Sequence, residues 1–579
     1  MLDDEVGCEV DVVTREVVLA ELVVDESAEL LPLVVAISAT TIPIASTLAI
    51  AMMVFALELI HSAYAGAVSA RGRNCRFCDS VSVEFRQEDS LVRGGRNHMH
   101  RRKSVKVVFA AVASLALLVP ATAGAKLSTT TQKAVEKVGK DAYTFGYAPV
   151  YMNTSVARFP ANQLINVRYL ATDQTKSIVK PNADTLYTIA VLDVGSDPII
   201  VHTPATGSRY FGLELVDSYT NVFGYIGNRV TGNAGGDYAI VGPTWSKTKT
   251  PLRKTVKKVI VSSTPRLWVI GRTLIDGPSD LAAVTSLQDQ ISMQLNSKVG
   301  TSTYLGCINS ILPGQLPKAG CFGMQAATSS VPPAFPQANL QFFKDFGAIT
   351  KSQPPLAQDK SLMTALKKYG VGPGLDPAKT QSADIQAALV KGAQTAQAAI
   401  DSGVITAKNR SLTKNNGWIL FDGVGDYKKD YLTRAIIAEF GLGANVPAEA
   451  VYPAAISDSA GRTLNGSAGA KYRIHFAAGQ LPKTTSAFWS ITLYGEDQYF
   501  VANSINRFAI GDRTAGLTTN TDGSTDIYIS AAEPTTAEHG TANWLPAPTG
   551  QFNLMLRIYR PTTAVLNGTW KYPRIEKIS

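Results

Sequence analysis

Two separate stretches of this chain alternate apolar and polar residues with a period close to two, and this pattern constrains the fold more than any other feature of the sequence. Gly, Pro and Asp divide both stretches into short runs, and Asp522-Gly523 has the composition of a hairpin turn. The runs cover residues 188–193, 199–202, 210–215 and 238–241, then 472–476, 488–494 and 526–529. Short runs divided by turns are typical of antiparallel sheets, so the sequence predicts two antiparallel β-sandwich modules of jelly-roll-like form.

Helical spacing precedes the first strand-rich stretch and fills much of the chain between the two. Apolar residues recur every three or four positions after Thr131, after Ser279 and after Ser382. We therefore expect an α+β multidomain protein in which a mainly helical middle segment joins the two sandwiches. The expected boundaries are 126–300 for a helix with the first sandwich, 301–440 for the helical and loop connector, and 441–579 for the second sandwich.

The residues after Met99 have the three parts of a secretory signal peptide. His100-Arg101-Arg102-Lys103 is basic, residues 107–119 are mostly apolar, and the segment ends in Ala123-Gly124-Ala125. We therefore predict a signal peptide at 99–125, cleavage after Ala125 and export, with the protein either secreted or associated with the cell envelope.

Residues 1–98 are interpreted as an upstream extension from a start codon assigned too early. They contain 28 residues without a charge, 30–57, which is long enough for a transmembrane helix. If residues 1–98 are translated, we expect this span to hold the protein at a membrane. Cys75 and Cys78 form a CxxC without a second pair or a His partner, so we predict no metal or redox site there.

The chain after Ala125 is basic. Residues 1–125 hold 11 of the 55 Lys and Arg and 15 of the 46 Asp and Glu, which leaves 44 basic and 31 acidic residues and a formal charge of +13. Such a charge attracts anionic lipid, cell-wall polymer or acidic glycan. We expect no nucleic-acid partner, because the sequence has no long Lys/Arg run and no aromatic-basic ribbon. A diffuse basic surface is the favoured interpretation.

Cys307 and Cys321 are the two cysteines that remain after the predicted cleavage. An even pair in an exported protein predicts a disulfide. Two free buried thiols are the alternative.

The two strand-rich stretches also share a weak internal duplication. Polar and aromatic residues recur in the same order in both stretches. They include a histidine, an Asn-Arg pair and an arginine at the end of the apolar runs 267–272 and 552–557. The proposed equivalents are His202 and His475, 210–215 and 488–493, Asn228-Arg229 and Asn506-Arg507, Asp237-Tyr238 and Asp526-Ile527-Tyr528, Pro243 and Pro534, and Arg272 and Arg557. Two modules of related topology would explain this recurrence.

Several short sequence motifs resemble those of known protein families. They are Pro181-Asn182-Ala183-Asp184-Thr185-Leu186-Tyr187, Asp217-Ser218-Tyr219-Thr220-Asn221, 227–232 and 242–245 in the first half, and Leu481-Pro482, 487–492, Asn506-Arg507, Asp522-Gly523, 543–548 and 557–561 in the second. The first set resembles the domain of unknown function numbered 1254, and the second resembles the one numbered 1214. The resemblance implies an α+β protein with β-sandwich modules, and it implies no activity. Ala183 departs from it, because a larger and often basic residue is expected there.

Familiar catalytic and cofactor motifs are missing from the sequence. It has no GxSxG elbow, HExxH, P-loop or GxGxxG-helix unit, and after Ala125 its histidines are His202, His475 and His539. We therefore predict no metal site and no cofactor.

The candidate site is a polar and aromatic set in the first strand-rich stretch. Asp184 and Asp217 are its candidate catalytic residues, because two carboxylates can share acid and base roles where their environments separate their pKa values. The other members are candidate ligand-binding residues, namely Asn182, Tyr187, Tyr219, Asn221, Arg229 and Trp245. Carboxylates and amides bind hydroxyls and aromatic rings stack on sugar faces, so the predicted ligand is glycan-like or another polyhydroxylated envelope molecule.

The same residues have a structural interpretation, which is favoured. Asp and Asn beside Thr, Tyr and Gly are ordinary turn residues, and Arg229 paired with Asp217 would brace two strands. The protein would then be a non-catalytic structural or assembly protein of the cell envelope. The sequence decides neither whether the protein is an enzyme nor whether it forms a homo-oligomer.

Overall fold

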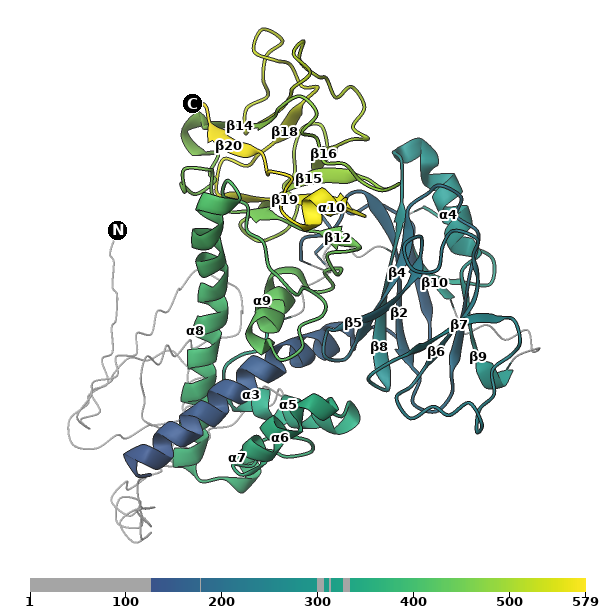
Figure 1. The fold of residues 1–579 in the computed structure, drawn as a ribbon, viewed down its shortest axis with the longest axis vertical. Coiled ribbons are helices and arrows are strands. Elements are labelled where there is room, and N and C mark those ends of the chain that lie inside the picture. Colours follow the sequence, from purple (N-terminus) through teal and green to yellow (C-terminus); the bar gives the residue numbers. More distant parts are fainter. Residues whose placement is uncertain (1–126, 177–178, 299–306, 312–313, 326–333) are drawn as a thin grey trace, which may run out of the picture. The chain divides into compact units, whose positions relative to one another are not determined.

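A computed structural model describes residues 127–176, 179–298, 307–311, 314–325 and 334–579, and Figure 1 shows their helices and strands. These residues belong to one structural unit, Ala125–Ser579. The predicted extension at 1–98, its apolar span at 30–57 and the predicted signal peptide at 99–125 lie outside the described residues. In the part of the chain that is described, no helix combines the length and the apolar character needed to cross a membrane.

The first strand region consists of two sheets that share one apolar core. The seven-stranded sheet has the order β11 (Phe322–Gln325), β10 (Cys307–Ile311), β1 (Leu164–Val167), β2 (Thr185–Asp193), β8 (Arg266–Leu274), β4 (Phe211–Asp217) and β5 (Val222–Gly227). The four-stranded sheet has the order β7 (Val256–Val261), β6 (Gly236–Val241), β3 (Ile199–Thr203) and β9 (Ser292–Leu295). Leu213 and Val269 of the larger sheet and Val201 and Ile240 of the smaller sheet are buried in the same cluster. Residues of the two sheets are therefore buried together in one apolar cluster.

The helices pack mainly on one another, and their buried cluster includes residues from the other face of the seven-stranded sheet. They are α3 (Thr129–Val156), α5 (Leu340–Ser352), α6 (Lys360–Lys367), α7 (Pro377–Thr380), α8 (Ala383–Lys414) and α9 (Tyr431–Gly441), with α4 (Leu281–Asp289) and α10 (Thr563–Leu566) elsewhere. Trp268 and Ile270 of β8 share a buried cluster with Phe145 of α3 and Leu389 of α8. Both faces of β8 are thus buried, which explains why its residues are almost all apolar.

The crossing of α3 and α8 depends on glycine (Figure 1). A Cβ atom on Gly139 would lie 2.1 Å from the carbonyl oxygen of Leu389, and one on Gly392 would lie 2.0 Å from that of Glu136. The two helix backbones are therefore closer than any side chain at these two positions permits.

The second strand region repeats the arrangement of the first. Its larger sheet has the order β12 (Ala450–Val451), β19 (Phe552–Tyr559), β15 (Trp489–Gly495) and β16 (Ala509–Gly511), with β13 (Ala454–Ala455) paired to β19. Its smaller sheet has the order β18 (Trp544–Pro546), β17 (Thr525–Ser530), β14 (Lys471–Phe476) and β20 (Arg574–Lys577). Ile491 and Leu556 of the larger sheet share a buried cluster with Ile474 and Ile527 of the smaller sheet.

The strand register confirms the predicted internal duplication. In the smaller sheets, His202 pairs with Asp237 and His475 pairs with Asp526 across antiparallel strands. The Nδ1 atom of His202 lies 2.8 Å from Oδ1 of Asp237, and that of His475 lies 2.7 Å from Oδ1 of Asp526. In the larger sheets, Arg272 pairs with Gly212 and Arg557 pairs with Ser490, at the positions that the sequence predicts to be equivalent.

The predicted fold class is right in outline and incomplete in detail. The described residues form a mixed α/β structure with several sheets, but the sheets are not purely antiparallel. Parallel pairs join β1 to β10, β10 to β11, β6 to β7 and β17 to β18. Each of these pairs needs a connection longer than a hairpin turn, which short-range sequence patterns do not reveal. The β-sandwich arrangement and its jelly-roll-like form stay predictions.

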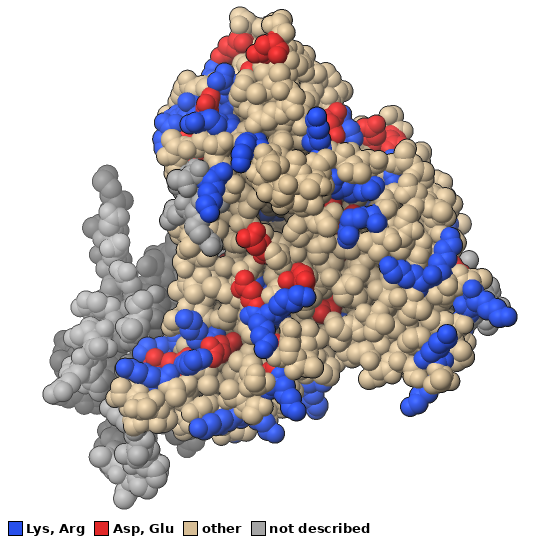
Figure 2. Space-filling view, in the orientation of Figure 1, with Lys and Arg blue, Asp and Glu red and all other residues tan. Residues whose placement is uncertain are grey.

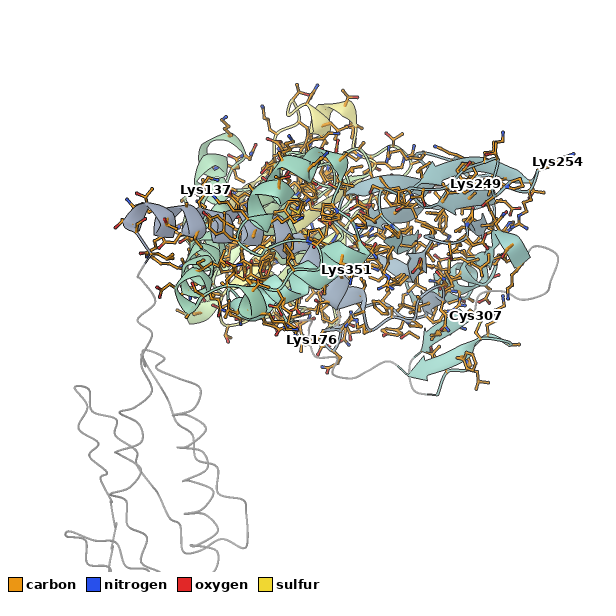
Figure 3. All side chains as sticks on the ribbon, turned by 90° about the horizontal axis from the view of Figure 1, so that it is seen from below. Lys137, Lys176, Lys249, Lys254, Cys307 and Lys351 are labelled. Carbon is orange, nitrogen blue, oxygen red and sulfur yellow. A yellow bond between two sulfur atoms is a disulfide. The ribbon has the colours of Figure 1, made fainter. Side chains whose placement is uncertain are left out.

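The segment expected to be a helical connector also contributes strands. β10 and β11 extend the seven-stranded sheet, although both fall within residues 301–440. The predicted Cys307–Cys321 disulfide is present and joins the start of β10 to the residue before β11. In Figure 3, Cys307 lies on these outer strands. Two short strands that pair at the sheet edge are thereby linked covalently.

Candidate functional site

A cavity of about 170 Å³ opens where the two strand regions meet, and we call it the main pocket. The first strand region supplies Tyr187 from β2 and Arg272 from β8, on the sheet face that points away from the shared core. The second supplies Arg557 and Tyr559 from β19, again on the face away from its own core. The end of α9 and the loop after it complete the wall. The pocket therefore combines segments that are far apart in the sequence.

The charged side chains that line the main pocket are mostly basic. They are Lys180, Arg272 and Arg557, which are buried, and Asp422, which is exposed. The positions of the basic groups relative to carboxylates decide what the pocket can bind, because a buried charge is costly unless it is paired.

Arg272 has a carboxylate partner. Its Nη1 donates to Oε2 of Glu214 at 2.6 Å, and its Nη2 donates to the carbonyl oxygen of Gly443 at 2.8 Å. Burial raises the pKa of Glu214 to about 7, although the positive charge of Arg272 opposes this effect. The pair lies within the first strand region, since Glu214 belongs to the adjacent strand β4.

Arg557 binds only neutral groups. Its Nη1 donates to Oγ1 of Thr492 at 2.6 Å, and its Nη2 donates to the hydroxyl of Tyr494 at 2.6 Å and to the carbonyl oxygen of Lys180 at 2.9 Å. No carboxylate of the described residues forms an ion pair with it. Its charge is thus solvated by dipoles alone.

Lys180 is the second buried basic residue in the lining of the main pocket that has no carboxylate partner among the described residues. Its Nζ donates to the carbonyl oxygen of Phe440 at 3.3 Å and to Oε1 of Gln498, and it lies 3.4 Å from the centre of the Phe440 ring. Burial lowers the pKa of Lys180 well below its usual range, and the charge of Arg557 lowers it further. Burial and the charge of Arg557 therefore both disfavour the charged form of Lys180, and an anion beside it would favour that form.

Hydroxyl and amide groups form the polar part of the wall. The Nδ2 of Asn182 donates to the hydroxyl of Tyr559 at 2.8 Å, and the backbone N–H of Asn182 donates to the hydroxyl of Tyr187 at 3.1 Å. The hydroxyl of Tyr452 donates to that of Tyr559 at 3.5 Å. The rest of the lining is mainly apolar and includes Leu420, Val424, Ile437, Phe440, Leu442 and Met555. This composition is typical of a pocket for a small organic molecule.

Asp184, one of the two candidate catalytic residues, connects the two strand regions. Its Oδ1 accepts a hydrogen bond from Nη2 of Arg513 at 2.6 Å, and its Oδ2 accepts one from Oγ of Ser490 at 2.6 Å. Asp184 is buried and does not line the main pocket. Its contacts are those of a brace between segments that are distant in sequence.

Asp217, the other candidate, shapes its own turn. Its Oδ1 accepts hydrogen bonds from the backbone N–H of Tyr219 at 2.8 Å and of Asn221 at 2.9 Å. Burial raises the pKa of Asp217, while hydrogen bonds from Ser263, Asn221 and Tyr219 oppose the rise. The hydroxyl of Tyr219 donates to the carbonyl oxygen of Gln353 at 2.8 Å inside the helical core. Asp217, Tyr219 and Asn221 therefore make local and packing contacts away from the pocket.

Arg229 does not pair with Asp217, which corrects the brace suggested from the sequence. Its Nε donates to Oε2 of Glu449 at 2.6 Å, and Glu449 also accepts a hydrogen bond from the hydroxyl of Tyr210 at 2.8 Å. Glu449 lies 220 positions further along the chain, and local patterns do not reveal such a partner. Trp245 donates from its indole N–H to the carbonyl oxygen of Thr250 at 3.0 Å and packs on the smaller sheet.

The predicted site residues thus do not converge on one cleft. Asn182 and Tyr187 line the main pocket, whereas Arg229 lines a separate groove beside β5 and β7. The sequence interpretation missed Lys180 and treated Arg272 and Arg557 only as repeated positions. A signal was present, because each arginine interrupts an otherwise apolar buried strand.

Figure 2 shows how charged side chains are distributed on one face of the molecule. On the face in Figure 2, Lys and Arg are scattered among Asp and Glu and form no single basic patch. Figure 3 shows Lys137 on α3 and shows Lys249 and Lys254 at the opposite end of the described part. The basic groups that are buried together around one cavity are those of the main pocket, Lys180, Arg272 and Arg557.

Comparisons with known proteins give one solved structure of similar fold and two family models that match parts of the chain. No curated protein matches the chain. Among solved structures, the VPA0106 protein from Vibrio parahaemolyticus is 22% identical, with a TM-score of 0.52 over 77% of this chain and 100% of that chain. An uncharacterised protein from Burkholderia cenocepacia is 12% identical, with a TM-score of 0.36 over 77% of this chain and 95% of that chain. The model of the family described as "Protein of unknown function (DUF1254)" matches residues 161–295, and that of "Protein of unknown function (DUF1214)" matches residues 449–563.

Proposed function

We propose that this protein binds a small organic anion, most simply a carboxylate, in the main pocket. The observation that carries the proposal is the pair of buried cations, Lys180 and Arg557, which line the cavity without a carboxylate partner among the described residues. An anion between them would supply the missing charge and would form charge-assisted hydrogen bonds.

The internal repeat supports this proposal. At the position equivalent to Arg557, Arg272 has Glu214 as its partner, whereas Arg557 has Thr492. The same strand geometry therefore holds a neutralised arginine in one half and an arginine without a counter-charge in the other. A bound anion would balance the charge of Arg557 as Glu214 balances that of Arg272.

Binding, and not catalysis, is the activity that we propose. Neither Asp184 nor Asp217 lines the main pocket, and both have their carboxylate oxygens engaged in other contacts. The predicted glycan-like ligand is also less suitable, because most of the lining is apolar and offers few groups for hydroxyls. An organic acid with an apolar body fits this lining better.

The location that we propose is outside the cytoplasm. The signal-peptide pattern of Met99 to Ala125 supports it, and so does the Cys307–Cys321 disulfide, since such bonds persist in oxidising compartments. N-terminal sequencing of the exported protein should give Lys126 as its first residue. An intact exported chain that begins at Met1 would instead make residues 30–57 the candidate anchor.

Titration calorimetry with hexanoate tests the binding function directly. We expect the wild-type protein to bind it and Lys180→Met to bind it about tenfold to a hundredfold more weakly, because a hydrogen bond to a charged group contributes about 1.5–3 kcal/mol. Lys180→Arg keeps the charge and should retain more of the affinity.

Lys176→Met is the matched control. Lys176 lies four residues earlier, pairs with Asp497 at 3.0 Å and does not line the main pocket (Figure 3). It should bind hexanoate as the wild-type protein does. An equal loss of hexanoate affinity in Lys180→Met and Lys176→Met would show that the effect comes from general surface charge. Absence of hexanoate binding in the wild-type protein would refute the proposal.

A further inference from the structure

A second cavity, of about 80 Å³, adjoins the main pocket and has a different character. The two cavities share Val179, Tyr187 and Leu442 as wall residues. Among the described residues that line the second cavity, Arg158 alone carries a charge, and it lies exposed at the rim. We call this space the apolar cavity.

The strand register places the two spaces side by side under one sheet. On the face of the sheet that points to the helices, Tyr187 of β2 is paired with Arg272 of β8, and the next pair on that face is Ile189 with Ile270. The first pair lines the main pocket, and the second lines the apolar cavity. Pairs on one face repeat at about 6.8 Å, since each strand residue rises about 3.4 Å. The main pocket and the apolar cavity are thus lined by successive residue pairs of β2 and β8.

Tyr187 lines both spaces, and its hydroxyl accepts a hydrogen bond from the backbone N–H of Asn182 at 3.1 Å. The main pocket has charged and hydroxyl groups in its lining. The apolar cavity has apolar residues such as Val167, Ile189 and Ile270 in its lining.

We infer that the ligand is an amphiphilic monocarboxylate, with its carboxylate between Lys180 and Arg557 and its hydrocarbon part extending past Tyr187 into the apolar cavity. The inference rests on the proposed function and adds the class of ligand. Charge complementarity fixes which end enters the main pocket, because the apolar cavity has no buried charged group to receive a carboxylate among the residues described there. Burial of the hydrocarbon then adds affinity in proportion to the apolar area removed from water.

A chain-length series on the full chain tests the inference, with acetate, hexanoate and decanoate as probes in titration calorimetry. For the wild-type protein, affinity should rise about fourfold for each methylene that is buried, which corresponds to about 0.8 kcal/mol. Ile189→Trp should fill the apolar cavity and abolish this rise while leaving the affinity for acetate unchanged. Ala171→Phe, which fills the same cavity from another wall, serves as a second variant if Ile189→Trp does not fold.

Ile405→Trp is the matched control, because Ile405 is an exposed residue of α8 outside both cavities. It should keep the full chain-length dependence. An unchanged dependence in a filled variant that still binds acetate would overturn the inference and leave the proposed function intact. Failure of all three carboxylates to bind the wild-type protein would refute the proposed function itself.

Discussion

Arg272 and Arg557 occupy equivalent register positions in two different sheets, and each donates a 2.6 Å hydrogen bond from Nη1 to the residue two positions after its cross-strand partner. That residue is Glu214 in the first strand region and Thr492 in the second. Because Thr492 stands where the first strand region has Glu214, Arg557 is buried without a carboxylate partner. Both arginines line the main pocket.

Thr492→Glu should restore the missing carboxylate and weaken anion binding. The introduced carboxylate would stand to Arg557 as Glu214 stands to Arg272, so it would balance the positive charge that we propose the ligand balances. We expect affinity for hexanoate to fall at least about tenfold, since a charged hydrogen bond contributes about 1.5–3 kcal/mol. Titration calorimetry measures this, with Thr492→Gln as the uncharged control of the same size. Equal affinities in both variants would contradict the proposed role of Arg557.

Lys180→Met should change the pH dependence of stability. An unperturbed lysine has a pKa of 10.5, and burial lowers the pKa of Lys180 in the folded protein. Between those two pKa values the unfolded chain binds more protons than the folded chain, so the stability of the wild-type protein rises with pH across this window. Below the lowered pKa, the full cost of burying the charge is present. The gain in stability of Lys180→Met relative to wild type should therefore be largest near neutral pH and shrink toward pH 10.

Urea unfolding at pH 7 and pH 10 measures this difference. Lys176→Met is again the control, and its stability relative to wild type should be the same at both values. A constant difference between Lys180→Met and wild type across the range would show that Lys180 is not buried in its charged form.

Asp184→Asn should destabilise the protein. The carboxylate accepts hydrogen bonds from Arg513 and Ser490, which belong to the other strand region, and Arg513 would keep only its longer ion pair with Asp512, at 3.7 Å. Breaking a buried pair costs about 3–5 kcal/mol, and partial exposure of Arg513 reduces this to about 2–3 kcal/mol. Asp426→Asn removes an exposed pair with Lys428 and should cost less than about 1 kcal/mol. Normal melting of Asp184→Asn would show that Asp184 does not brace the two strand regions.

The double variant Cys307→Ser and Cys321→Ser should lower stability by about 3 kcal/mol. The disulfide closes a segment with a sequence separation of 14, and a loop of that length restricts the unfolded chain by about this amount. The loss should appear in urea unfolding and should match that of the wild-type protein in reductant. Two alkylatable thiols in folded, unreduced protein would contradict the bond.

Local sequence patterns determined several strands, several helices and the repeat. Period-two runs specify which residues of a strand face a core, and the His202–Asp237 and His475–Asp526 pairs follow from equivalent positions on neighbouring strands. The disulfide also followed, because two cysteines alone remain after the predicted cleavage. These features depend on short spans of chain, in which the spacing of residues determines the side of the strand or helix on which each side chain lies.

Tertiary structure alone decided the partners of the buried charged groups. Arg557 donates to the carbonyl oxygen of Lys180 although 377 positions separate them, and Arg229 pairs with Glu449 instead of with the nearer Asp217. A sequence pattern states that a side chain is buried, but not which distant segment packs against it. That choice follows from how the two strand regions and α9 pack together, which a large number of weak apolar contacts determine collectively. The main pocket exists only in that packed arrangement, so its residues could not be grouped from the sequence.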